Sequence, residues 1–228
     1  MKTFVIVLSG GKGERVGINK PKQYIEVAGK PIIMYSLSVF ENSNKIDGII
    51  VVSKAEWKSY ISECVSKSGL KKVFAYAEGG DSRQESVLNG LIIARQFLQK
   101  DDIVLIHDAA RPCVTNEIIE DVLDLGDFDG VMPAIPVNDT IYMAENNLIG
   151  CTLNRDILYA GQAPESYVFG KYLEINEQAT KQDLMNTRGS SEIAVKNGMK
   201  IRIGKGDSRN SKITTLIDLQ QFKSLMEK

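Results

Sequence analysis

Residues 3–17, TFVIVLSGGKGERVG, join an apolar, β-branched run to a glycine-rich loop. The run, Thr3–Leu8, is almost continuously apolar, which predicts a strand buried on both faces of a parallel sheet. In an α/β sheet, ligands bind beyond the carboxyl ends of the strands, and the loop lies there. Three glycines within four residues let backbone N–H groups approach a phosphate closely. The stretch therefore indicates a phosphate-binding α/β protein, with an ordinary mobile surface loop as the alternative.

The same alternation of short strands and amphipathic segments continues to about residue 137. The predicted strands are Thr3–Leu8, Ile46–Ser53, Lys72–Tyr76, Ile103–His107 and Gly130–Ala134. The predicted helices are Ile32–Phe40, Lys54–Lys67, Gln84–Gln99 and Asn116–Leu125. This alternation predicts an α/β fold with a Rossmann-like, mostly parallel sheet that carries helices on both faces.

The pattern changes after residue 137. Residues 138–143 and 148–153 flank a polar turn, which predicts a hairpin, and we expect residues 138–155 to form a projecting β-arm. A hairpin inserted in a parallel sheet has no local partner for its apolar side, so we expect a second copy of the chain to cover it. Beyond the arm the chain is predicted to form helices Phe169–Ala179, Ser190–Asn197 and Leu216–Met226, strand Lys200–Gly204, and a short strand within 210–215. Since no linker or repeat divides the sequence, a single domain is predicted over residues 1–228.

Composition restricts the possible partners. Of the 228 residues 43% are hydrophobic and 25% charged, and the formal net charge is −1. No overall basic field attracts a nucleic acid polymer or an anionic membrane, so an anion site must be local. The apolar N-terminal stretch is too short to span a membrane. Cys64, Cys113 and Cys151 lack CxxC spacing, which argues against disulfides and structural zinc, and we expect a cytoplasmic protein.

The glycine loop differs from two common nucleotide-binding motifs. The pattern GxxxxGK[ST] of a P-loop is absent, and Gly11 and Gly13 are followed by Gly17, which misses GxGxxG by one residue. That spacing disfavours an NAD-dependent oxidoreductase, the alternative from another enzyme class. Arg15 and Lys22 follow the loop and supply positive charge for the phosphates of a triphosphate.

Asp108 follows the strand ending at His107, at the same edge of the predicted sheet as the loop. A carboxylate there is well placed to hold Mg²⁺ against a triphosphate; alternatively it caps the next turn or pairs with Arg111. We expect His107 to be a core or supporting histidine rather than a catalytic base.

Two further segments contribute candidate ligand contacts. Glu78–Ser86 forms a second glycine turn that presents backbone groups and the Ser86 hydroxyl to a base edge; alternatively Asp81 or Ser82 simply caps the following helix. Residues 210–215, NSKITT, bring in another cation, Lys212.

Together these segments resemble the family of 2-C-methyl-erythritol 4-phosphate cytidylyltransferases and ribitol 5-phosphate cytidylyltransferases. The motifs that carry the resemblance are, in chain order, SGGKGERVG, PKQY, GGDSRQESVLNGL, HDAARP, NDT, NRDILYAGQAPES and NSKITT. The resemblance implies a fold of the nucleotide-diphospho-sugar transferase type. It also implies an enzyme that transfers CMP from CTP to a small polyol phosphate, giving a CDP-polyol and pyrophosphate.

The resemblance assigns roles to matching positions. It implies catalytic roles for Arg15, Lys22 and Lys212. It implies CTP binding by Leu8, Ser9, Gly10, Gly11, Gly13, Gly80, Asp81, Arg83, Ser86, Asp108 and Ala109, with Mg²⁺ at Asp108. It implies acceptor binding by Arg111, Thr140 and Arg155. In the family, the last two reach the acceptor from the neighbouring subunit of a homodimer joined by the arms.

Three segments bear on the acceptor. Gly161-Gln162 resembles the ribitol branch, whereas HDAARP and PVNDT resemble the methylerythritol branch. Both branches usually have Thr-Pro-Gln where this chain has Ala163-Pro164-Glu165, and Thr-Asp where it has residues 186–192. We expect a pentitol phosphate such as ribitol 5-phosphate, with 2-C-methyl-D-erythritol 4-phosphate as the alternative and Arg188 as a possible acceptor contact. A non-catalytic nucleotide-binding paralogue is disfavoured because Arg15, Lys22 and Lys212 are all present.

Overall fold

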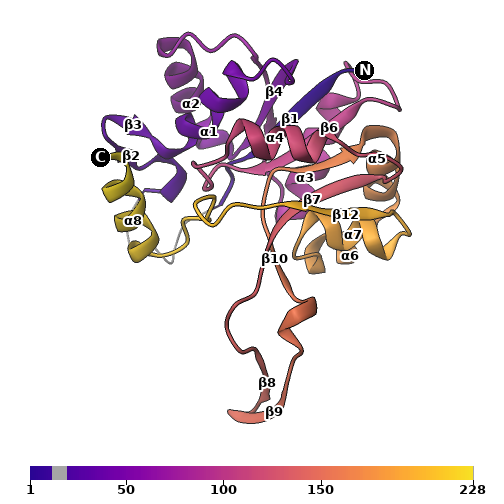
Figure 1. Cartoon of the computed structure of the whole chain (residues 1–228). Coiled ribbons are helices and arrows are strands. Elements are labelled where there is room, and N and C mark those ends of the chain that lie inside the picture. The colour runs from indigo at the N-terminus through magenta and orange to yellow at the C-terminus, as the bar shows by residue number, and fades with distance from the viewer. Residues whose placement is uncertain (12–19, 228) are drawn as a thin grey trace.

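The computed structural model describes residues 1–11 and 20–227 and is built around a twisted, mostly parallel eight-stranded sheet (Figure 1). The strand order is β10-β7-β11-β6-β1-β4-β5, and β12 pairs with β7 outside this path. The strands are β1 (Thr3–Leu8), β4 (Gly48–Ser53), β5 (Val73–Glu78), β6 (Ile103–Asp108), β7 (Gly130–Pro136), β10 (Tyr159–Gly161), β11 (Glu165–Val168) and β12 (Ile201–Lys205). Only β10 and β11 run against the other strands of this sheet.

Helices cover both faces of the sheet, because successive side chains of a buried strand point to opposite sides. The helices are α1 (Ile32–Asn42), α2 (Ala55–Lys67), α3 (Arg83–Ala94), α4 (Asn116–Leu123), α5 (Phe169–Gln178), α6 (Lys181–Asn186), α7 (Ser190–Lys196) and α8 (Leu216–Met226). Val5 and Val7 of β1 pack in the core that includes α1, α2 and α4. Phe4 and Ile6 pack in the core that includes α3, α5 and α7. The predicted fold class is therefore confirmed.

Two sequence expectations about this framework were wrong. The helix predicted to reach Gln99 ends at Ala94, since the chain turns so that Phe97 packs on Phe4 and Phe74, with ring centroids 6.3 and 4.9 Å away. The segment 210–215 is not a strand. Its Ile213 N–H donates to the carbonyl of Ala110, a loop residue, over 2.9 Å.

The arm lies where the sequence predicted it. β8 (Tyr142–Glu145) and β9 (Leu148–Thr152) pair antiparallel, and every residue of both strands is exposed. Asn146 and Asn147 in the turn have φ values of 49° and 64°, the left-handed pair that a type I′ hairpin turn requires. Figure 1 shows the arm projecting away from the sheet and from the helices that cover it.

The carboxyl ends of the parallel strands form one edge, and strand register decides what meets there. Leu8 at the end of β1 pairs with Asp108 of β6 on one side and Val52 of β4 on the other. Ser53 of β4 in turn pairs with Glu78 of β5. Four chain segments therefore leave the sheet side by side.

No helix in the parts of the chain that the structure describes is long and apolar enough to cross a membrane.

Gly90 of α3 packs closely against the sheet. A Cβ at this position would lie 2.6 Å from Cγ2 of Ile6 and 3.1 Å from Cγ2 of Val52, both in the core. We expect Gly90→Ala to lower the free energy of unfolding by about 1–3 kcal/mol, because overpacking forces core side chains to shift. Urea unfolding measures this.

Gly189→Ala is the matched control, since a Cβ there meets nothing within 4 Å and the backbone is extended. Its cost should stay under about 1 kcal/mol. Equal losses in the two variants would contradict the overpacking explanation.

Candidate active site

A pocket of about 650 Å³ opens at the carboxyl ends of the parallel strands. It is lined by Leu8, Ser9, Gly10, Gly11, Lys22, Gln23, Lys54, Gly80, Asp81, Ser82, Arg83, Ser86, Asp108, Ala110, Lys212 and Thr214. These residues come from segments at opposite ends of the chain, from Leu8 to Thr214, and the register described above brings the strand ends among them together. Four cationic side chains and three glycines belong to the lining, which suits a ligand rich in phosphate.

Most of the residues assigned to CTP and catalysis lie in this pocket. Of that set, Leu8, Ser9, Gly10, Gly11, Lys22, Gly80, Asp81, Arg83, Ser86, Asp108 and Lys212 line it. Ala109 is buried, at 1% exposure, and its neighbour Ala110 lines the pocket instead. Gly13 and Arg15 lie outside the described residues.

The residues assigned to the acceptor do not line this pocket. Arg111 lies beside it, where its guanidinium donates to the carbonyls of Asn210 (2.7 Å) and Gly161 (3.3 Å). Thr140 and Arg155 belong to the arm segment, and Arg155 donates to the carbonyl of Asn138 over 2.7 Å. Within one chain, the arm residues and the pocket are therefore not brought together.

Side chains beside β1 hold the start of the first glycine loop. Gln23, in the 3₁₀ helix η2 (Lys22–Tyr24), donates to the carbonyls of Ser9 (2.5 Å) and Gly11 (2.9 Å). The Tyr24 hydroxyl also donates to the Ser9 carbonyl, and its ring stacks on Trp57 with centroids 4.6 Å apart. These bonds fix the described part of the loop against the protein.

The second glycine turn is braced by its own helix. The Ser82 hydroxyl accepts from the Glu85 N–H over 3.0 Å and caps α3, so of the two capping candidates the structure selects Ser82. The Ser86 hydroxyl accepts from the Gly80 N–H over 3.0 Å and donates to the Ser82 carbonyl. The turn is thus held in shape by protein groups before any ligand arrives.

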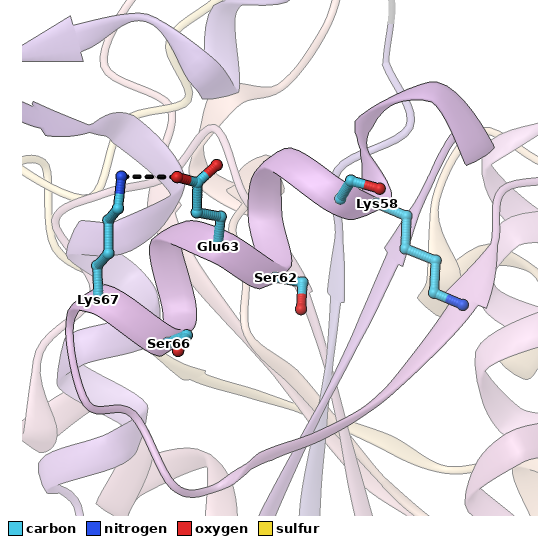
Figure 2. Close-up of a pocket in the computed structure, with 6 residues that line it drawn as sticks. Lys58, Ser62, Glu63, Ser66 and Lys67 are labelled. Carbon is cyan, nitrogen blue, oxygen red and sulfur yellow. Dashed lines mark ion pairs between the residues drawn. The ribbon is translucent and has the colours of Figure 1, made fainter.

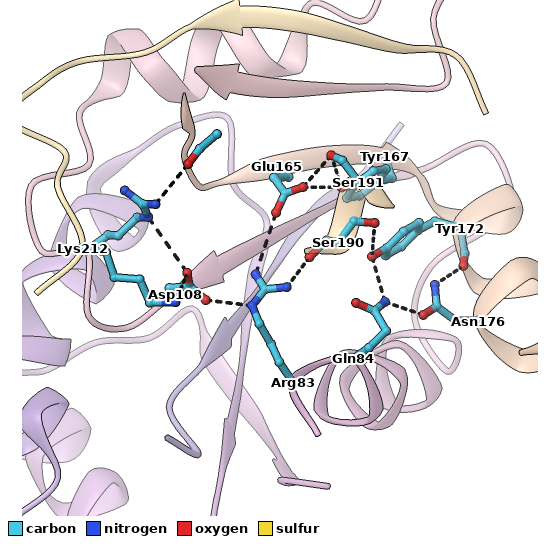
Figure 3. Close-up of polar contacts among 12 residues, drawn as sticks. Arg83, Gln84, Asp108, Glu165, Tyr167, Tyr172, Asn176, Ser190, Ser191 and Lys212 are labelled. Atoms are coloured by element: carbon cyan, nitrogen blue, oxygen red, sulfur yellow. Dashed lines mark hydrogen bonds and ion pairs between the residues drawn. The ribbon is translucent and has the colours of Figure 1, made fainter. Parts of the chain in front are cut away.

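Asp108 gathers the cations of the site. One oxygen accepts from Arg83 Nε at 3.2 Å and the other from Lys212 Nζ at 2.8 Å (Figure 3). Arg111 Nε lies 3.9 Å from the second oxygen. Burial alone would raise the pKa of Asp108, but attraction to Arg83 and Lys212 outweighs it and holds that pKa far below its usual value. The pairing with Arg111 that was the alternative to a metal role exists, yet Arg83 and Lys212 are the closer partners.

His107 is a core histidine, as expected. It is fully buried, its ring packs edge-on against Phe40 at 5.0 Å, and its Nε2 lies 3.1 Å from the Arg111 carbonyl. Nδ1 has no hydrogen-bond partner among the residues that the structure describes. Burial lowers the pKa of His107 to about 3, so the ring stays neutral near pH 7 and supports the turn that carries Arg111.

Sequence reasoning missed Lys54, Gln23 and Thr214, which also line the pocket. Lys54 directly follows β4 and was assigned only to the start of a helix. The rule that ligands bind at the carboxyl ends of strands applies to β4 as well as to β1, so it offered a signal for Lys54. Gln23 lies within PKQY, beside the lysine that was selected.

A second depression lies on the outer surface of α2 and differs in kind. Lys58, Ser62, Glu63 and Lys67 line it, and Figure 2 shows these side chains along a single helix. Its one ion pair joins Lys67 to Glu63 one turn apart at 2.7 Å, with both side chains more than 60% exposed. This is a solvated helix face, since every residue that lines the depression belongs to α2.

Comparison with known proteins agrees with the geometry. The model of the 2-C-methyl-D-erythritol 4-phosphate cytidylyltransferase family matches residues 3–228. The chain belongs to this family. It is 39% identical over 217 residues to the 2-C-methyl-D-erythritol 4-phosphate cytidylyltransferase of Clostridium beijerinckii, which covers 94% of this chain and 93% of the relative. It is 30% identical over 230 residues to the ribitol-5-phosphate cytidylyltransferase of Streptococcus agalactiae, which covers 100% of this chain and 96% of the relative.

The fold agrees as well. The crystal structure of 2-C-methyl-D-erythritol 4-phosphate cytidylyltransferase from Francisella tularensis superposes with a TM-score of 0.83 at 25% identity, covering 98% of this chain and 99% of that one. The chain is accordingly an enzyme of the nucleotidyltransferase class, a cytidylyltransferase. Relatives carry both acceptor names, so membership in the family leaves the acceptor open.

The buried state of His107 predicts how stability depends on pH. The folded pKa of about 3 lies below the ordinary value of about 6.5, so the unfolded chain binds the proton more tightly. The stability that this ring provides is complete above pH 6.5 and is lost as pH falls toward 3, by about 1.4 kcal/mol per unit. Since the chain contains one histidine, urea unfolding at pH 7.5 and 5.0 measures the effect directly.

His107→Gln removes the titration and keeps an amide donor for the Arg111 carbonyl. The loss of stability between pH 7.5 and 5.0 should be about 2 kcal/mol smaller in this variant than in the parent. Parallel pH profiles in the two proteins would contradict a neutral buried ring.

Proposed function

We propose that the protein transfers CMP from CTP to a pentitol phosphate such as ribitol 5-phosphate, releasing pyrophosphate and a CDP-polyol. The observation that carries the nucleotide half is the pocket, where Lys22, Lys212 and two glycine turns surround one space at the strand ends. Support for the pentitol comes from Gly161-Gln162, the dipeptide that resembles the ribitol branch. It lies beside the pocket, where the Gly161 carbonyl accepts from Arg111 and Gln162 exchanges hydrogen bonds with Asp207. The alternative acceptor is 2-C-methyl-D-erythritol 4-phosphate, which the name of the family and HDAARP favour.

The chemistry requires positioning and charge rather than an enzyme nucleophile. A phosphate oxygen of the acceptor attacks the α-phosphorus of CTP in line, and pyrophosphate leaves. Negative charge that develops at the α-phosphate is stabilised by Lys22 and Lys212, with Arg15 as the third proposed cation. Lys212 is already oriented by Asp108, so little side-chain rearrangement is needed during the reaction.

A divalent cation fits the donor set at Asp108 in one specific way. Mg²⁺ in nucleotide sites takes one or two carboxylates together with phosphate oxygens. Asp108 offers one ionised carboxylate at the pocket wall, shared with Arg83 and Lys212. We propose that Asp108 holds Mg²⁺ jointly with the triphosphate, and that the bound ion supplies further charge neutralisation there.

We also propose that two chains join through their arms, and that Thr140 and Arg155 serve the neighbouring subunit's acceptor site. Exposed apolar side chains of the arm support this proposal: Tyr142, Met143, Leu148 and Ile149 are 53–73% exposed. Side chains of this kind are expected to be covered by a partner. Neither Thr140 nor Arg155 lines the pocket of its own chain, which also supports the proposal.

The acceptor is tested by pyrophosphate release from CTP and Mg²⁺ with ribitol 5-phosphate or 2-C-methyl-D-erythritol 4-phosphate in parallel. We expect kcat/KM for ribitol 5-phosphate to be at least about tenfold higher, a difference of roughly 1.4 kcal/mol. The opposite preference would identify 2-C-methyl-D-erythritol 4-phosphate as the acceptor. No turnover of either compound would overturn the proposed function.

The shared site is tested by mixing two inactive variants. Lys22→Ala damages the nucleotide half of a site, and Arg155→Ala damages the arm of its neighbour. If the arms exchange, a refolded mixture recovers about a quarter of the parent activity, because half of the molecules are mixed dimers that each keep one intact site. A mixture as inactive as its components would contradict the arm proposal.

A further inference from the structure

Glu165 is a buried carboxylate directly behind the pocket. It begins β11, beside Ile106 of β6, and is 6% exposed. Its Oε2 accepts from the hydroxyls of Tyr167 and Ser191, each over 2.6 Å. Its Oε1 lies 3.8 Å from Nη2 of Arg83. Since Glu165 does not line the pocket, whatever it contributes to a bound nucleotide must pass through another side chain.

Arg83 is that side chain. Its guanidinium lies between two carboxylates: Nε donates to Oδ1 of Asp108 over 3.2 Å, while Nη2 faces Glu165 (Figure 3). The remaining nitrogen, Nη1, donates to the Ser190 hydroxyl over 2.7 Å. The guanidinium therefore holds Asp108 through one nitrogen and one oxygen only. The other oxygen, Oδ2, accepts from Lys212 at 2.8 Å.

The two segments whose residues depart from the family pattern meet at this guanidinium. Glu165 comes from the first segment, and Ser190 and Ser191 come from the second. Arg188, the suggested acceptor contact, is instead exposed at the surface, and its backbone N–H donates to Glu192. The substitutions thus change the support behind the pocket rather than its surface.

We propose that Glu165 is a positioning residue for Lys212: it shares Arg83 with Asp108 and thereby leaves Oδ2 of Asp108 to the lysine. An arginine whose Nη2 is released from Glu165 can bind a carboxylate through two nitrogens, which is its preferred geometry. Both oxygens of Asp108 would then belong to Arg83, and the Lys212 ammonium would lose its anchor. The kinetic part of this proposal rests on the proposed function.

Charge gives the proposal a distinctive kinetic signature. Arg83, Arg111 and Lys212 face two carboxylates, Asp108 and Glu165, so the cluster carries one net positive charge. The Glu165→Gln substitution leaves the cluster with two net positive charges. Extra positive charge attracts the triphosphate in the ground state, whereas a displaced Lys212 stabilises the transition state less. A variant that simply damaged the fold would not bind CTP as well as the parent.

The first experiment compares Glu165→Gln with the parent in pyrophosphate release. We expect kcat to fall by about tenfold, less than the loss of a direct transition-state donor, while KM for CTP stays equal or decreases. Asp102→Asn is the matched control: Asp102 is also 6% exposed, accepts two backbone N–H bonds, and lies at the opposite end of β6. It should lose stability and keep its kcat.

A double-mutant cycle tests whether Glu165 acts through Arg83. In an Arg83→Met background, Glu165→Gln should have no further effect on kcat, because the group that transmits it is gone. An equal tenfold loss in both backgrounds would overturn the proposal, as would a Glu165→Gln variant with unchanged kcat.

A readout without turnover separates this proposal from the proposed function. The ¹⁵N NMR signal of Arg83 Nε–H, assigned by its absence in Arg83→Lys, should shift in full-length Glu165→Gln and remain in place in Asp102→Asn. If neither acceptor is turned over, the proposed function fails while this measurement still decides the positioning role. An Arg83 signal that does not move in Glu165→Gln would overturn it.

Discussion

The pocket depends on the ion pairs that the Asp108 carboxylate makes. This carboxylate stands at the end of a fully buried strand, and three cations converge on it: Arg111, three residues further along the chain, and Arg83 and Lys212, from distant segments. A buried carboxylate is costly unless it is paired, so these segments and the strand stabilise one another's positions. Because the charges are assembled by folding, a triphosphate meets donors that are already oriented.

The sheet explains why such distant segments meet. Parallel strands place their carboxyl ends at one edge, and the register of β1 with β4 and β6 pairs Leu8 with Val52 and Asp108 there. Ser9, Lys54 and Ala109 follow these strand ends at the same edge. The arm leaves the sheet between β7 and β10, at this same edge, because it follows the carboxyl end of β7, which runs parallel to β6 (Figure 1). The pocket and the proposed contact between subunits thus use different segments of the chain that leave the sheet at one edge.

The sequence was informative where local pattern decides the structure. Buried parallel strands are continuous apolar runs, and the glycine turns and Asp108 carry their own signals, so these features were predictable. β11 was missed because it is four residues long, begins with Glu165 and owes its conformation to pairing with β6. Lys54 was missed because its place in the pocket depends on which strands lie beside β4. The contacts of Glu165 join it to residues far away in the sequence, Arg83 and Ser191, so no local pattern predicts them.

One feature beside the pocket gives the protein an optical property. Trp57, the only tryptophan of the chain, stacks on Tyr24, whose hydroxyl binds the Ser9 carbonyl at the start of the glycine loop. A ring in this position is a single fluorophore coupled through one side chain to the wall of the pocket. Its emission therefore provides an intrinsic signal from that part of the molecule, without a label and without background from other indoles.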